Sequence, residues 1–126
     1  FSDYLEDKVL DHVFGGTAYT APSTLYVGLY TAAPSDTGGG TEVTGGSYAR
    51  KSMPAMTVSG TTQATNGAAV EFVTATGSWG TVTHCGVFDA ASSGNLLGWA
   101  ALTASKAVAS GDVFRFDAGD LDITLA

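Results

Sequence analysis

Residues 81–102 read Thr81-Val-Thr-His-Cys-Gly-Val-Phe-Asp-Ala-Ala-Ser-Ser-Gly-Asn-Leu-Leu-Gly-Trp-Ala-Ala-Leu102, and they carry the clearest secondary-structure signal in the chain. Its two ends are rich in the β-branched and aromatic residues that favour strands. The linker at 90–95 contains the Ser, Gly and Asn that tolerate turn dihedrals. We therefore predict two strands joined as a β-hairpin. Similar short runs bounded by Gly and Pro recur from Thr24 onward, so the whole chain is expected to be mainly β.

Length and charge narrow the class of protein. A chain of 126 residues can bury enough surface to fold as one domain, residues 1–126, without metals or disulfides. The formal net charge is −7, with only five Lys and Arg residues, so we expect no nucleic-acid partner. No apolar run approaches the length of a membrane helix, and the N-terminus lacks the layout of a signal peptide, so we expect no membrane partner. The first residue is Phe1 and not Met, so a short N-terminal segment is expected to have been removed or to lie outside this sequence.

One short α-helix is predicted at the N-terminus, over residues 3–14. Ser2 is a good N-cap, acidic residues follow it in the first turns, and a Gly pair at 15–16 gives a C-terminal stop. Leu5, Val9 and Val13 recur at helical spacing and form an apolar stripe. A helix of this length is marginal alone, so we expect the stripe to pack on the chain's own strands or on a neighbouring subunit.

From Thr24 onward, apolar residues recur at every second position, as in a strand, and no longer at helical spacing. In residues 24–31, aliphatic side chains alternate with Tyr26, Gly28 and Tyr30, so one face can enter a core while the Tyr face meets a second surface. Residues 32–47 lose all periodicity and contain a run of three Gly residues, which predicts a long surface loop. Further strands are predicted at 48–52, 55–58, 68–73, 81–89, 96–102, 113–116 and 121–125. This spacing predicts an antiparallel β-sandwich with Greek-key or jelly-roll connections and one short N-terminal α-helix.

The residues that could do chemistry are few and isolated. Cys85 has no Cys partner and is expected to be a small buried hydrophobe. His12 and His84 lack the spacing of a zinc site, and His84 is expected to be a partly buried, hydrogen-bonded strand residue. No Gly-x-Ser-x-Gly elbow supports a hydrolase triad. We therefore predict no catalytic residues and no cofactor.

An acidic turn near the C-terminus is the best candidate for a metal site. Asp117, Asp120 and Asp122 flank a Gly, but their spacing does not match an EF-hand loop. Alternation already explains Asp120 and Asp122 as the wet face of the last strand. We expect no bound calcium. Trp79 and Trp99 could in principle stack on a sugar, but aromatic residues in alternating strands are more often core or interface residues.

Five stretches together carry a resemblance that covers nearly the whole chain. They are SDYLEDKVLDHVFGGTA (2–18), TLYVGLYTAAP (24–34), GGSYAR (45–50), WGTVTH (79–84) and GVFDA (86–90). In this order they resemble a family of small tailed-bacteriophage proteins labelled tail fibre proteins. The resemblance implies a non-enzymatic virion component, found in the virion and assembled in the cytoplasm of the bacterial host.

The function predicted from the sequence is that of a bacteriophage virion structural protein that self-associates, as a trimer or a particle-bound oligomer, and binds other virion proteins. A tail-fibre-like module and a capsid-decorating module are both open. The predicted partner interface comprises Leu5, Val9, Val13, Tyr26 and Tyr30. The alternative is a carbohydrate-binding module for a host surface glycan, which requires an exposed Trp or Tyr beside Asp or Asn at the loops 32–47 or 90–95. Neither loop contains a Trp or a Tyr of its own.

Overall fold

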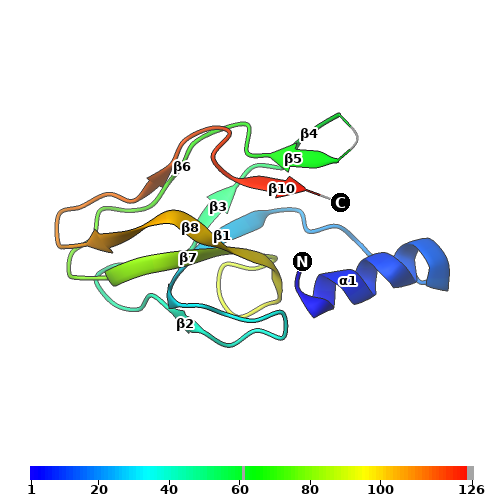
Figure 1. The fold of residues 1–126 in the computed structure, drawn as a ribbon, viewed down its shortest axis with the longest axis horizontal. Coiled ribbons are helices and arrows are strands. Elements are labelled where there is room, and N and C mark those ends of the chain that lie inside the picture. The colour runs from blue at the N-terminus through cyan, green and yellow to red at the C-terminus, as the bar shows by residue number, and fades with distance from the viewer. Residues whose placement is uncertain (61, 125–126) are drawn as a thin grey trace.

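A computed structural model describes residues 1–60 and 62–124. The N-terminal helix is α1 (Asp3–Leu10), which continues as a π-helical turn, η1 (Asp11–Gly15). The strands are β1 (Leu25–Ala32), β2 (Thr41–Glu42), β3 (Lys51–Met53), β4 (Thr57–Ser59), β5 (Gln63–Thr65), β6 (Val70–Glu71), β7 (Gly80–Phe88), β8 (Leu96–Val108), β9 (Arg115–Phe116) and β10 (Asp122–Thr124) (Figure 1). Every pairing between these strands is antiparallel. The predicted all-β class with one short N-terminal helix is confirmed.

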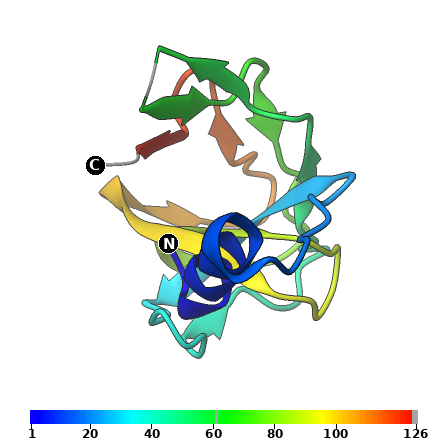
Figure 2. The ribbon, with the colours of Figure 1, turned by 90° about the vertical axis from the view of Figure 1, so that its right-hand side faces the viewer.

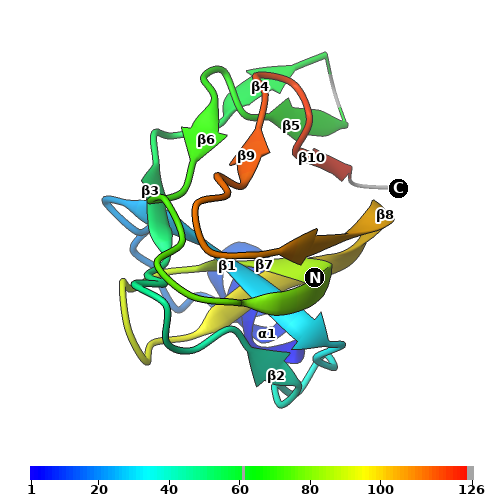
Figure 3. The ribbon, with the colours of Figure 1, turned by 90° about the vertical axis from the view of Figure 1, so that its left-hand side faces the viewer.

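The strands form two layers. The larger layer is a five-stranded sheet in the order β2-β1-β7-β8, in which β3 also pairs with β1. The opposite layer holds a three-stranded sheet, β10-β5-β4, and the pair β6-β9. Figures 2 and 3 show the small sheets facing the large sheet, with α1 beside the large sheet. The core therefore lies between the two layers.

The predicted hairpin is the centre of the large sheet. Strands β7 and β8 pair from Gly80 and Val108 to Phe88 and Leu96, and β7 also pairs with β1. Their connecting loop is closed by Asp89, whose carboxylate accepts hydrogen bonds from the backbone and side-chain nitrogens of Asn95. Strand β8 runs six residues beyond its predicted end because pairing resumes after an irregularity between Val82 and His84.

The core combines aliphatic side chains from both layers with a cluster of aromatic side chains. Its buried members are Val27, Leu29, Val43, Met53, Val70, Phe72, Ala75, Trp79, Val82, Cys85, Val108, Phe114 and Phe116. Phe72 meets Trp79 and Phe114 edge to face, at ring-centroid distances of 6.4 and 5.9 Å. Edge-to-face contacts of this kind stabilise a core beyond simple burial. Cys85 and Trp79 are core residues, as predicted.

Several boundaries differ from the predicted ones. The predicted loop 32–47 contains β2 and the buried Val43, and β5 was not predicted at all. The strand predicted from Tyr48 begins at Lys51, because Tyr48 lies in a turn closed by its N–H donating to the carbonyl of Gly45. The predicted strand 121–125 is observed as β10, and its residue 125 lies outside the described residues.

Candidate functional site

Helix α1 is hydrogen-bonded to the large sheet at its N-terminus. Ser2 is 1% exposed, its backbone N–H donates to the carbonyl of Leu97, and its hydroxyl donates to the carbonyl of Leu96. The same hydroxyl accepts from the N–H of Leu5, which is the predicted N-cap bond. The N–H of Asp3 donates to the carbonyl of Asp36. These bonds set the direction of the helix axis relative to β8.

The far half of the helix carries an exposed apolar surface. Val9, Leu10, Val13 and Phe14 are 40, 58, 60 and 81% exposed, and we call these four residues the helix tip. Val9 and Val13, and likewise Leu10 and Phe14, are four residues apart and therefore lie on the same side of the helix. Figure 1 shows this end of the helix extending away from both layers of strands. No residue of α1 or η1 is buried.

The structure divides the predicted partner interface. Val9 and Val13 lie together on the helix tip, and Leu5 is half-buried nearer the sheet. Tyr26 and Tyr30 lie on β1. Tyr26 is half-buried, whereas Tyr30 is buried within the chain, with its ring stacked 6.2 Å from Phe88.

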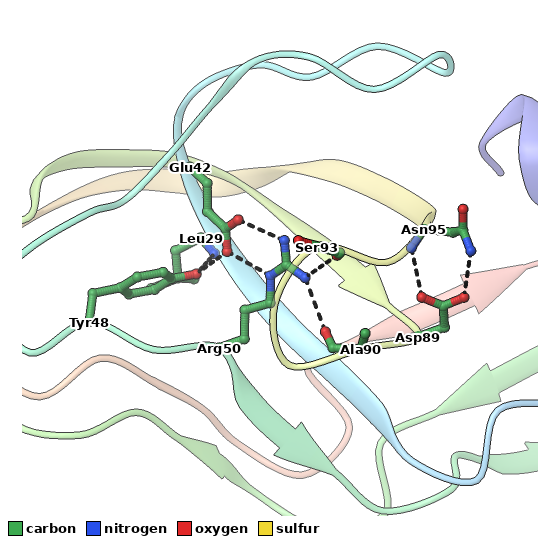
Figure 4. A network of polar contacts seen from close by, with 8 residues as sticks. All are labelled: Leu29, Glu42, Tyr48, Arg50, Asp89, Ala90, Ser93 and Asn95. Carbon is green, nitrogen blue, oxygen red and sulfur yellow. Dashed lines mark hydrogen bonds and ion pairs between the residues drawn. The ribbon is translucent and has the colours of Figure 1, made fainter.

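On the face of β1 that carries Tyr30, a network of polar side chains holds the neighbouring loops in place. Arg50 donates two hydrogen bonds to the Glu42 carboxylate, from Nε to Oε2 and from Nη2 to Oε1, each 2.9 Å long (Figure 4). Its Nη1 donates to the carbonyls of Ala90 and Ser93, which belong to the hairpin loop. The guanidinium lies 3.4 Å from the centre of the Phe88 ring. Arg50 therefore ties together three segments that are distant in sequence.

Tyr48 joins this network and also bonds a backbone N–H of β1. Strand β1 pairs with β3 as far as Val27 and with β2 from Tyr30. Between these pairings the carbonyl of Leu29 accepts from the N–H of Val43, whereas the N–H of Leu29 is bonded by a side chain. The Tyr48 hydroxyl accepts from the N–H of Leu29 at 2.9 Å and donates to Glu42 Oε2 at 2.7 Å. Burial, followed by the hydrogen bond and charge of Glu42, raises the pKa of Tyr48 above its usual range.

The charge of Arg50 is maintained by the same contacts. Burial opposes the charged guanidinium, but Glu42 outweighs this effect through its hydrogen bonds and charge and keeps the pKa of Arg50 above its usual value. Sequence reasoning missed Arg50, Glu42 and Tyr48 as a group. The available signal was the scarcity of basic residues in an acidic chain, since there are only five.

A polar hollow of about 350 Å³ lies over this network. It is lined by Tyr4 and Asp36, by the glycines after Asp36, and by Ser93 and Asn95 of the hairpin loop. Asp36 Oδ1 accepts from the indole N–H of Trp99 at 3.0 Å. The two loops considered for glycan binding thus meet in space, and Tyr4 of α1 lines the hollow between them. Trp99 of β8 does not line the hollow but is bonded to Asp36, which does.

The remaining predicted candidates have structural roles. His84 is a half-buried strand residue with Nδ1 2.8 Å from the Thr83 hydroxyl, as predicted. Its ring also lies beside Trp99, which was not predicted. His12 is exposed, and its Nδ1 accepts from the N–H of Tyr19. Burial raises the pKa of the Cys85 thiol to about 11, so the thiol is protonated at neutral pH.

The acidic turn is held by hydrogen bonds within the chain. Asp117 Oδ1 accepts from Arg115 Nε at 2.7 Å, and Asp120 Oδ2 accepts from the N–H of Asp117. Asp122 lies exposed on β10. Within residues 1–60 and 62–124, no three His, Cys, Asp or Glu side chains gather in an arrangement that could hold a metal ion. Over the same residues, neither helix has the length and apolar character needed to cross a membrane.

Comparison with known proteins gives one family. A family described as Podophage GP4 fiber I protein gp80 matches residues 1–124, which is nearly the full length of the chain. No curated protein matches the chain.

Proposed function

The chain belongs to the phage fibre family described as podophage GP4 fiber I protein gp80, and from that premise we propose that it is a non-enzymatic structural protein of the virion that self-associates through its helix tip. The family supports the resemblance to tail fibre proteins seen in the sequence. It also favours a tail-fibre-like role over capsid decoration. We place the protein in the virion, assembled in the cytoplasm of the bacterial host.

The observation that carries the proposal is the exposure of the helix tip. Its four side chains expose about 400 Å² of apolar surface, which is the size of the largest patch on a typical monomer, and such patches are often functional. The bonds of Ser2 hold the N-terminal end of the helix on β8, and the tip extends away from the chain's own sheets (Figure 1). A second molecule is therefore needed to cover it, and we propose another copy of this chain, in a trimer or a particle-bound oligomer, together with other virion proteins.

The area of the helix tip alone is small for a stable interface. Burying about 400 Å² contributes roughly 10 kcal/mol by area. Association costs about 4–15 kcal/mol in lost freedom, so the tip needs further contacts to give a stable complex. Standard interfaces bury about 800 Å² on each partner, roughly twice what the tip offers.

The experiment that tests the proposal measures mass in solution and incorporation into particles. We expect the wild-type chain to sediment as an oligomer at micromolar concentration and to be present in purified virions. Phe14→Asp places a charge on the tip and should give a folded monomer that is absent from virions. Val73→Asp, at a 48% exposed site after β6, is the matched control and should leave both properties intact. A monomeric wild-type chain at all concentrations would contradict the proposal.

Glycan recognition remains a second candidate function because of the polar hollow. Tyr4 offers an aromatic ring there, and Asp36 and Asn95 offer hydrogen-bonding groups in the same space. These are the groups with which proteins orient sugars. Since Trp99 donates to Asp36, its fluorescence should report binding when the chain is titrated with host surface polysaccharide. No fluorescence change, together with no difference between wild type and Asp36→Asn, would contradict this function.

A further inference from the structure

A second apolar surface lies on the other side of the helix anchor. A groove of about 390 Å³ opens between the two layers, and we call it the apolar groove. One wall is the core-facing side of β8, with Gly98 and Ala100, and the opposite wall is β10, with Ile123. The rest of the lining is mostly apolar, with Phe1, Leu5, Met56 and Leu121, and it also includes the polar Asp122 and Thr124 of β10.

The walls of the groove are two strands that each have a partner on one side only. Within the described residues, β8 pairs with β7 alone and β10 pairs with β5 alone. Figure 2 shows that the two layers do not join into a closed barrel at these edges. Residues of both edge strands line the groove. Natural proteins cover such edges, because exposed apolar strand edges promote association.

We propose that the helix tip of one copy of this chain seats in the apolar groove of a second copy. This inference rests on the proposed self-association and assigns the surface that receives the helix. The tip projects as a knob and the groove is a hollow of the same apolar character, so one contact covers both surfaces. A volume of about 390 Å³ accommodates the side chains of Phe14 and one or two of its aliphatic neighbours.

The alternative contact, in which two helix tips pack against each other, accounts for only one of the two exposed apolar surfaces. Such a contact would bury the same residues on both partners but leave the groove uncovered. It would also rely on about 400 Å² per partner, half of a standard interface. Contact between the tip and the groove adds the groove walls and the adjoining edge of β8 to the buried area. Because the two contacting surfaces differ, repetition of the contact closes a ring or extends a filament.

The test uses two variants that each disable one side of the contact. Phe14→Asp disables the tip and leaves the groove intact, whereas Ala100→Asp places a charge in the groove and leaves the tip intact. Ala100 is exposed in the single chain, so the added charge should not disturb the fold. The matched control is Ala101→Asp, because the next residue of a strand points to the opposite face. Gly98→Leu blocks the groove without a charge, since a Cβ at Gly98 meets no atom within 4 Å.

Each variant is measured by sedimentation velocity, alone and in an equimolar mixture. We expect Phe14→Asp, Ala100→Asp and Gly98→Leu each to be folded monomers, with self-association weakened at least ten-fold, and Ala101→Asp to remain oligomeric. The mixture of Phe14→Asp and Ala100→Asp should form a one-to-one heterodimer, because an intact tip then meets an intact groove. Contact between two tips gives no heterodimer in this mixture.

The outcomes separate this inference from the proposed function. If wild type is oligomeric and Ala100→Asp and Gly98→Leu are too, the groove is not the acceptor, and only this inference fails. Absence of the heterodimer at concentrations where wild type is fully assembled also overturns it. A monomeric wild type overturns both proposals. Circular dichroism of each variant confirms that the monomers are folded.

Discussion

Replacing Arg50 by Ala should destabilise the fold more than any other single change at a charged residue. The Arg50 side chain is 9% exposed and that of Glu42 is 24% exposed. The substitution leaves Glu42 with Tyr48 as its remaining partner, removes the bonds to the carbonyls of Ala90 and Ser93, and uncovers the Phe88 ring. Breaking a buried ion pair by removing one partner costs about 3–5 kcal/mol. Because Glu42 can regain some water, we expect the lower end, about 3 kcal/mol.

Urea unfolding followed by Trp fluorescence measures this effect. With a denaturant dependence of about 1–3 kcal/mol per molar, a loss of about 3 kcal/mol lowers the midpoint by roughly 1–3 M. Arg115→Ala is the matched control, since Arg115 also contacts two carboxylates, those of Glu71 and Asp117, but is half exposed. Solvent screens such pairs, so this variant should unfold near the wild-type midpoint. Equal midpoints for the two variants would refute the reasoning that the Arg50 network stabilises the loops.

Four further predictions concern other residues of the fold. Tyr48→Phe removes the acceptor of the Leu29 N–H, so it should cost about 1–3 kcal/mol and accelerate hydrogen exchange at that amide; an unchanged exchange rate would contradict the role given to this hydroxyl. Ser2→Ala removes the helix cap and the bond to Leu96, so it should lower the stability measured in thermal melts by about 1–2 kcal/mol and reduce the helical signal in circular dichroism. Ser59→Ala, at an exposed site, is the control and should change neither the stability nor the helical signal. Burial raises the pKa of Cys85 to about 11, above the unfolded value near 8.5, so the native state holds its thiol proton more tightly than the unfolded state. The resulting stabilisation is complete below about pH 8.5 and is lost as the pH rises towards 11. The urea midpoint should therefore fall over this pH range, and Cys85→Val should make that fall smaller. A chelator should leave the melting temperature unchanged, because Asp117 and Asp120 already have partners within the chain, and a drop reversed by calcium would show that a metal is bound.

The elements predicted well are those whose signal is contained in one continuous stretch. The β7–β8 hairpin follows from the strand residues and turn residues of residues 81–102, and both of its strands begin within one residue of the predicted position. The helix follows from Ser2, the acidic first turn and the Gly pair, and its helical run ends at Gly15. Local signals of this kind need no knowledge of the rest of the chain.

The elements that were missed depend on contacts between distant segments. Strands β2 and β5 have two and three residues, too few for alternation to be recognised. Arg50 finds its partners at residues 42, 90 and 93, and no spacing in the sequence indicates that these positions meet. Asn66 is also buried without a sequence signal, and its side chain bonds the backbone of Asp117, Gly119 and Leu121.

The polar interactions and the helix have different roles in this molecule. Arg50, Tyr48 and Asn66 use buried polar side chains to fix loops, so they stabilise the single chain. The helix is bonded to β8 by Ser2 at one end, while none of the four residues of the tip is buried in the chain itself. A surface held in one orientation before binding loses less entropy on association. We therefore propose that the exposed side chains of the helix tip serve assembly, because a second molecule that covers them would bury the apolar surface that the single chain leaves in water.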